Sequence, residues 1–159
     1  MFTKAGNGSL SSDAFLTLLG YENPQYCMED YLMHYLTLDK EFIGFAEKYF
    51  RKYDFVLLSN DVSEWSAFIT EYYQRNQYFM DKIVSGDVKC RKPDDKIFQL
   101  TLERIKKQPS ECIFIDNSVK NLDAAEKLGI KPILFNRDNV TYAGTIVNIF
   151  AELGAVLLC

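Results

Sequence analysis

Three short stretches of this sequence carry side chains that are suited to phosphoryl chemistry. Ser59 and Asn60 end one apolar run, and Lys92 precedes a proline and a helical pattern. Asp116 and Asn117 end a second apolar run. A hydroxyl with neighbouring backbone N–H groups can hold phosphoryl oxygens, and an ammonium group can neutralise them. Carboxylate and amide oxygens are ligands that Mg²⁺ accepts. Together these residues predict a phosphoryl site beside a metal ion.

Each of these residues also has a simpler structural interpretation. Ser59 can serve as a strand-end cap, Lys92 as a solvated charge, and Asp116 as part of a turn before a helix. In parallel α/β sheets, however, ligands bind outside the carboxyl ends of the strands. The shared position at or near strand ends therefore favours a binding site over three unrelated local features.

The element that must position the acidic pair is a strand over residues 112–115. This short run is apolar and rich in β-branched residues, so we expect a strand buried on both faces. Ser118 is placed to cap the helix that follows, and Gly129 to end it. The pattern predicts a strand, a turn with two polar side chains, and a helix.

The remaining chain shows the same alternation of apolar runs and helical periodicity. Strands are expected over 55–58, 82–85, 112–115 and 131–135. Helices are expected over 11–19, 26–36, 39–52, 63–75, 94–107, 118–128 and 145–153. Residues 1–8, 86–94 and 136–142 are expected to be loops, and 155–158 either one more strand or a tail. Strands that alternate with helices in this way predict a parallel sheet with helices on its faces.

Composition excludes several classes of protein. The net charge is −4 and the basic residues form no stripe, which argues against nucleic acid or an anionic membrane surface as the main partner. No apolar run approaches the roughly 20 residues of a membrane span, and no signal-peptide pattern opens the sequence. The four cysteines form no C-x-x-C pair, so we expect reduced thiols and a cytoplasmic location. These cysteines are Cys27, Cys90, Cys112 and Cys159.

The motifs resemble those of the haloacid dehalogenase-like (HAD) hydrolase superfamily. LLSND (57–61) is similar to its second motif, KPDDKIF (92–98) to its third, and FIDNSVKNLDAAEKLGI (114–130) to its fourth. The resemblance implies that Ser59 binds the transferring phosphoryl group and that Lys92 stabilises an aspartyl intermediate. It implies a Rossmannoid parallel sheet, and Mg²⁺ as cofactor at Asp116 and Asn117.

Within the superfamily, the sequence is similar to sugar-phosphatase-like members and to the phosphatase domain of epoxide hydrolases. SLSSDAFLTLLG (9–20) and the two helices expected after it resemble the helical cap of these enzymes. We therefore expect a partial cap over residues 1–50 and an α/β core over 51–159.

Two departures from the family pattern affect the expected activity. The nucleophilic aspartate of the family lies in a D-x-D-x-[TV] motif, and this sequence contains no such motif. Asn117 stands where a second aspartate usually binds Mg²⁺, and a neutral amide lowers the affinity for the cation. We therefore expect little or no hydrolysis of phosphate esters by this chain.

The first central strand of the family is also missing, which implies an N-terminally truncated version of the fold. Its loss would expose the edges of the strands at 54–58 and 112–116. Either these strands pair directly, another chain fills the gap, or the protein is a fragment of low stability. The run 155–158 is a further candidate for the gap, and exposed edges favour self-association.

The sequence thus predicts a HAD-family, phosphatase-like protein with impaired catalysis. Its expected ligand is a small phosphorylated metabolite. The alternatives are a non-catalytic phosphate-binding or scaffold protein, and a truncated gene product without a role of its own.

Overall fold

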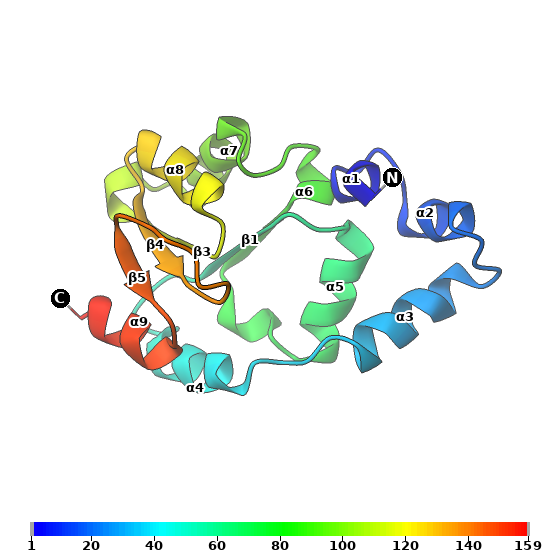
Figure 1. The fold of residues 1–159 in the computed structure, drawn as a ribbon, viewed down its shortest axis with the longest axis horizontal. Helices are drawn as coiled ribbons and strands as arrows, with labels where there is room; N and C mark the ends of the chain where they lie inside the picture. The colour runs from blue at the N-terminus through cyan, green and yellow to red at the C-terminus, as the bar shows by residue number, and fades with distance from the viewer. Residues whose placement is uncertain (1, 159) are drawn as a thin grey trace. The chain divides into compact units, whose positions relative to one another are not determined.

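The computed structural model describes residues 2–158, which form helices and parallel β-strands in two compact units (Figure 1). Unit 1 consists of Met1–Asp39 and Tyr49–Arg91. Unit 2 consists of Lys40–Lys48 and Lys92–Cys159. The α/β class with parallel pairing is confirmed, whereas the boundary between cap and core at residues 50 and 51 stays a prediction.

Unit 1 combines a two-stranded parallel sheet with several helices (Figure 1). The strands are β1 (Val56–Ser59) and β2 (Asp81–Val84), with Ser59 opposite Val84. The α-helices are α1 (Phe2–Gly6), α2 (Ser12–Leu18), α3 (Pro24–His34), α5 (Ser63–Tyr72) and α6 (Ser85–Val88), and η1 (Asn76–Tyr78) is a 3₁₀ helix.

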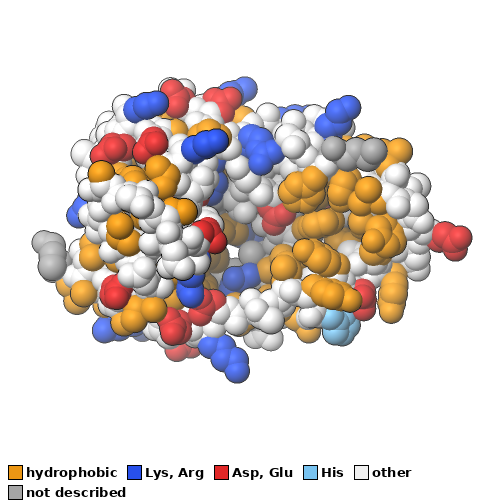
Figure 2. All heavy atoms as spheres, viewed as in Figure 1, with side chains coloured by type: hydrophobic (Ala, Val, Ile, Leu, Met, Phe, Trp, Pro, Cys, Tyr) orange, Lys and Arg blue, Asp and Glu red, His pale blue; other side chains and the backbone are white. Residues whose placement is uncertain are grey.

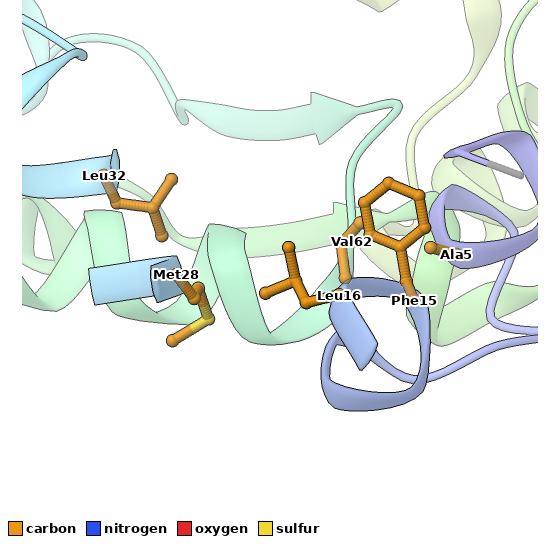
Figure 3. Close-up of a cluster of buried hydrophobic side chains, with 6 residues drawn as sticks. All are labelled: Ala5, Phe15, Leu16, Met28, Leu32 and Val62. Atoms are coloured by element: carbon orange, nitrogen blue, oxygen red, sulfur yellow. The ribbon is translucent and has the colours of Figure 1, made fainter. Parts of the chain in front are cut away.

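Local capping explains where the helices before β1 begin. The Ser11 hydroxyl accepts a hydrogen bond from the Ala14 N–H at 3.2 Å, and the Asn23 side chain accepts one from the Tyr26 N–H at 3.3 Å. Between these helices and α5 lies a buried apolar cluster (Figure 3). Its members are Ala5, Phe15, Leu16, Met28, Leu32 and Val62.

Hydrophobic side chains also gather on the surface of unit 1, around α1, α2, α3 and α5 (Figure 2). The Trp65 ring lies 6.0 Å from the Phe2 ring and 5.8 Å from the Tyr31 ring, centroid to centroid. The Trp65 indole N–H donates to the hydroxyl of buried Ser12 at 2.6 Å, which fixes the ring against α2.

Unit 2 is built on a three-stranded parallel sheet in the order β3-β4-β5 (Figure 1). The strands are β3 (Ile113–Asp116), β4 (Lys131–Phe135) and β5 (Thr145–Val147). The α-helices are α4 (Lys40–Tyr49), α7 (Asp95–Ile105), α8 (Val119–Lys127) and α9 (Phe150–Val156), and η2 (Pro109–Glu111) is a 3₁₀ helix.

Helices cover both faces of this sheet, as expected. On one face, Phe98 of α7 packs edge-on against Phe114 of β3, with ring centroids 5.2 Å apart. On the other face, the Phe150 ring of α9 packs against the rings of Phe135 in β4 and Phe45 in α4. The ring centroids are 4.7 Å and 5.2 Å apart, respectively. The centre of the sheet is buried, since Ile133 and Leu134 are both 0% exposed.

The strand that precedes the acidic pair is less buried than expected. Ile113 and Ile115 are 38% and 37% exposed, so burial on both faces was wrong. In the described part of unit 2, β3 has one hydrogen-bonded neighbour, β4. In unit 1, the hydrogen-bonded neighbour of β1 is β2.

Several other predicted elements were wrong. Residues 2–6, expected to be a loop, form α1, and residues 85–88 form the short α6. The predicted helix over 145–153 is a strand followed by α9, because the β-branched residues at its start pair with β4. In the run 155–158, the first two residues end α9 and the last two form a turn, so the run does not form a strand.

Two further findings concern the length of the helices and the state of the cysteines. Within residues 2–158, no helix has the length and apolar character needed to cross a bilayer. Cys27, Cys90 and Cys112 form no disulfide bond among the described residues, and Cys159 lies outside them.

Candidate phosphoryl-binding site

A buried ion pair lies at the carboxyl end of β3. The Lys92 ammonium nitrogen is 2.7 Å from Asp116 Oδ2, and the two side chains are only 10% and 7% exposed. Lys92 precedes α7, and its ammonium also lies 5.3 Å from the centre of the Phe114 ring. The structure therefore brings together two of the residues that the sequence analysis selected, although they are distant in the chain.

The second oxygen of Asp116 holds the start of α8. Asp116 Oδ1 accepts hydrogen bonds from the Ser118 N–H at 2.8 Å and from Asn121 Nδ2 at 3.1 Å. Ser118 is the N-cap residue, as predicted, but its hydroxyl does not accept the expected capping hydrogen bond. An aspartate two residues before the helix satisfies the backbone N–H instead, in an Asx turn.

Asn117 points its amide towards a different acidic residue. Its Nδ2 donates to Asp138 Oδ2 at 3.0 Å, at the exposed end of the sheet. Neither Asp138 nor Asn121 was among the site residues predicted from the sequence. Asp138 follows β4, the neighbour of β3, so the rule that ligands gather at strand ends could have indicated it.

These donors do not by themselves form a magnesium site. Both Asp116 oxygens are engaged, one by an ammonium group and the other by two N–H donors. Among residues 2–158, no group of three or more His, Cys, Asp or Glu side chains is placed to hold a metal ion. A hard cation needs several oxygen ligands, and Asp116 with Asn117 supplies too few.

Ser59 and Asn60 lie at the carboxyl end of β1, where the chain turns towards α5. The next residue fastens this turn: the Asp61 N–H donates to Ser85 Oγ at 3.0 Å, and the Gly86 N–H donates to the Asp61 carbonyl at 3.1 Å. A Cβ atom at Gly86 would lie 2.8 Å from the Ser63 backbone nitrogen. The loop is therefore held at a fixed distance from α6.

The carboxyl group of Asp61 is partly buried, and Asp61 was not among the residues predicted from the sequence. Burial raises its pKa, and a hydrogen bond that Oδ1 accepts from the Val62 N–H at 2.8 Å opposes this in part. Burial destabilises the charged carboxylate by more than this single hydrogen bond stabilises it, so the net effect is a raised pKa.

Replacement of Asp61 by asparagine should stabilise the protein at neutral pH. The pKa of Asp61 is higher in the folded protein than its ordinary value of 3.8. The wild type therefore loses stability as the pH rises from 3.8 through the folded-state pKa. Asp61→Asn removes the charge and keeps an acceptor for the Val62 N–H. Urea denaturation at a series of pH values measures the free energy of unfolding of both proteins. The variant should exceed the wild type by most at pH 7, and the difference should shrink towards pH 4. An advantage that grew on acidification would contradict the assignment.

The selected residues thus fall into two groups. Ser59 and Asn60 belong to unit 1, and Lys92, Asp116 and Asn117 belong to unit 2. Each set lies at or beside the carboxyl end of a parallel strand, which is where α/β proteins bind ligands.

Parallel strands flanked by helices, with polar side chains at their carboxyl ends, define an α/β protein of the Rossmannoid class. The sequence profile of the haloacid dehalogenase-like hydrolases matches residues 14–129. The chain belongs to the haloacid dehalogenase-like hydrolase family.

Solved structures of this family share the fold. A HAD phosphatase from Thermococcus onnurineus is 23% identical with a TM-score of 0.78, over 90% of this chain and 68% of that one. A HAD family enzyme from Bacteroides thetaiotaomicron, in complex with magnesium and inorganic phosphate, is 20% identical with a TM-score of 0.71, over 89% and 78%. The 2-haloacid dehalogenase from Pseudomonas syringae is 17% identical with a TM-score of 0.72, over 90% and 66%.

Two curated relatives are much longer proteins. Acyl-CoA dehydrogenase family member 10 of Mus musculus is 52% identical over 46 residues, which is 29% of this chain and 4% of the relative. The drimenol cyclase drtB of Aspergillus calidoustus is 30% identical over 102 residues, 64% of this chain and 17% of the relative. The chain therefore spans a small part of each.

Proposed function

We propose that this chain is a phosphate-binding member of the HAD-like hydrolase family that does not by itself turn over phosphate esters. In this proposal, Ser59 and Asn60 bind phosphoryl oxygens and Lys92 neutralises their charge. The observation that carries it is the buried ion pair, because Asp116 holds the Lys92 ammonium in place before any ligand arrives. A preorganised cation loses little side-chain freedom when it binds an anion.

The lack of turnover follows from the residues available as nucleophile. Members of the family attack phosphorus with an aspartate, and none of the aspartates in this sequence lies in a D-x-D pair. Asp116 is a poor substitute because Lys92, Ser118 and Asn121 already engage both of its oxygens.

The proposed ligand is a small phosphorylated metabolite. Magnesium would bind weakly at Asp116 and Asn117, since the amide brings no charge and the carboxylate is already paired. Cysteines without disulfide bonds among the described residues suit a reducing compartment, so we place the protein in the cytoplasm.

Binding is tested by thermal unfolding in millimolar inorganic phosphate, with potassium chloride at the same ionic strength as reference. Phosphate should raise the melting temperature, because a ligand that binds only the folded state stabilises it. Ser59→Ala should abolish the rise, whereas Ser110→Ala, a change at an exposed serine, should preserve it. No rise in the wild type, or an equal rise in Ser59→Ala, would contradict phosphate binding at Ser59.

Catalysis is tested separately, with p-nitrophenyl phosphate and magnesium chloride. We expect no release of nitrophenol above the rate in buffer. Turnover by the wild type that Lys92→Ala abolishes would contradict the proposal and would require a nucleophile other than a D-x-D aspartate.

A second candidate function is that of an interaction protein which uses the edge strand of a sheet. The exposed Ile113 and Ile115 of β3 favour it, because apolar edge strands are templates for pairing with another chain.

A further inference from the structure

The loop after β1 is fastened to the residues that follow β2. Ser59 ends β1 opposite Val84, the last residue of β2, and Ser85 comes next in the chain. Beyond this strand pair, the Asp61 N–H donates to Ser85 Oγ at 3.0 Å, so a side chain continues the connection between the strands. The Gly86 N–H donates to the Asp61 carbonyl at 3.1 Å. Two consecutive residues therefore hold both backbone polar groups of Asp61.

The Ser85 hydroxyl group also binds the N-terminal segment. Its side chain is 0% exposed, and the hydroxyl donates to the Gly6 carbonyl at the end of α1. A hydroxyl group has one hydrogen and two acceptor lone pairs. The Asp61 carbonyl lies 3.2 Å away but already accepts from the Gly86 N–H. We therefore assign the hydrogen to Gly6, which leaves the lone pairs of the oxygen for the Asp61 N–H.

The N-terminal segment approaches the same residues with its backbone. In unit 1, α1 lies beside α6 (Figure 1). Gly8 has a φ of +70°, and a Cβ atom there would lie 2.0 Å from the Gly86 carbonyl oxygen. Only glycine combines this φ with so close an approach. Residues 6–8 are thus held against Ser85 and Gly86, the two residues that hold Asp61.

On the basis of the function proposed above, we propose that Ser85 is a positioning residue for the phosphate site. It holds the loop of Ser59 and Asn60 in the conformation that binds phosphoryl oxygens, and the Gly6 carbonyl orients its hydroxyl group. Because Asp61 directly follows this loop, fixing its backbone reduces the freedom that the loop loses when phosphate binds. The N-terminal segment thereby influences the affinity for phosphate through Ser85.

The first test follows the loop without any ligand. Hydrogen exchange measured by NMR should show a protected Asp61 amide in the wild type, and Ser85→Ala should raise its exchange rate about tenfold or more, because the acceptor is lost. Rates are compared with those of the protected β2 amides, which removes the contribution of global unfolding.

Ser12→Ala is the matched control for this exchange experiment. Ser12 is also a buried serine, 1% exposed, and its hydroxyl accepts the Trp65 indole N–H instead of the Asp61 N–H. Its replacement should change the exchange rate of Asp61 by less than about twofold. An Asp61 rate that rises equally in Ser85→Ala and Ser12→Ala, or in neither, would overturn the proposal.

The second test measures affinity by calorimetric titration of the folded protein with inorganic phosphate at constant ionic strength. Ser85→Ala should raise the dissociation constant about tenfold, and Ser12→Ala should change it by less than about twofold. Urea denaturation gives the stability of both variants, so a loss of affinity is separated from a loss of folding. Equal affinities of the wild type and Ser85→Ala would overturn the positioning role.

A pair of glycine variants keeps the test valid if the alanine variant of the serine does not fold. Gly8→Ala forces residues 6–8 away from Gly86. Gly20→Ala is the control, because Gly20 has a φ of +93° but no atom lies within 4 Å of its Cβ position. Only Gly8→Ala should speed the exchange of Asp61 and weaken phosphate binding, each by about threefold or more. Equal effects of the two glycine variants would overturn the proposal.

Failure of the positioning role is distinguishable from failure of phosphate binding. If phosphate binding depends on Ser59 but not on Ser85, only the positioning role is overturned. If the wild type binds no phosphate, the proposed function is overturned together with the action of Ser85 on it, whatever the exchange rate of Asp61.

Discussion

Replacement of Lys92 by methionine should lower the free energy of unfolding by about 3 kcal/mol, near the lower end of the range for breaking a buried ion pair. Methionine keeps most of the side-chain volume against Phe114 and removes the charge, which leaves the Asp116 carboxylate buried beside an apolar group. The loss stays near 3 kcal/mol because the Ser118 N–H and Asn121 still bond to Asp116 Oδ1.

Urea denaturation measures this effect, and a double-mutant cycle with Asp116→Asn isolates the ion pair. The double variant should lose less than the sum of the two single variants, because neither charge is then left alone. Lys96→Met is the matched control: Lys96 is an exposed lysine of α7, and its replacement should change stability by less than about 0.5 kcal/mol. Equal losses in Lys92→Met and Lys96→Met would show that the pair contributes nothing.

Truncation of Phe98 to alanine should cost about 3–5 kcal/mol, the usual range for a buried phenylalanine. Phe98 is 1% exposed, and its ring meets the Phe114 ring at an interplanar angle of 87°. Its removal leaves a cavity between α7 and β3, the strand that ends at Asp116. The surrounding side chains can fill such a cavity only in part, so most of the lost contact energy is not recovered.

The control for Phe98→Ala is Gln99→Ala. Gln99 is the next residue of the same helix, and its side chain is exposed. It should shift the free energy of unfolding by less than about 0.5 kcal/mol, since alanine also suits a helix. A loss below about 1 kcal/mol for Phe98→Ala would mean that the ring does not carry the packing of α7 on β3.

Local patterns predicted the elements that build the candidate site. The strand over 131–135 has the bounds of β4, and the strand before Asp116 begins one residue later than predicted. These segments were identifiable because apolar runs and capping residues act over a few positions of the chain. The same patterns did not identify Thr145–Val147 as a strand, because its state depends on pairing with β4.

The sequence alone was enough to recognise the family, the parallel α/β class, and Ser59, Lys92 and Asp116 as the residues to test. These conclusions rest on residue types and on order along the chain. Only the tertiary structure decided which groups meet: the Lys92 ammonium with Asp116, Asn117 with Asp138, and the Ser118 N–H with Asp116 in place of its own side-chain cap. Hydrogen-bond partners and burial depend on residues distant in the chain, and local sequence patterns do not encode these distances.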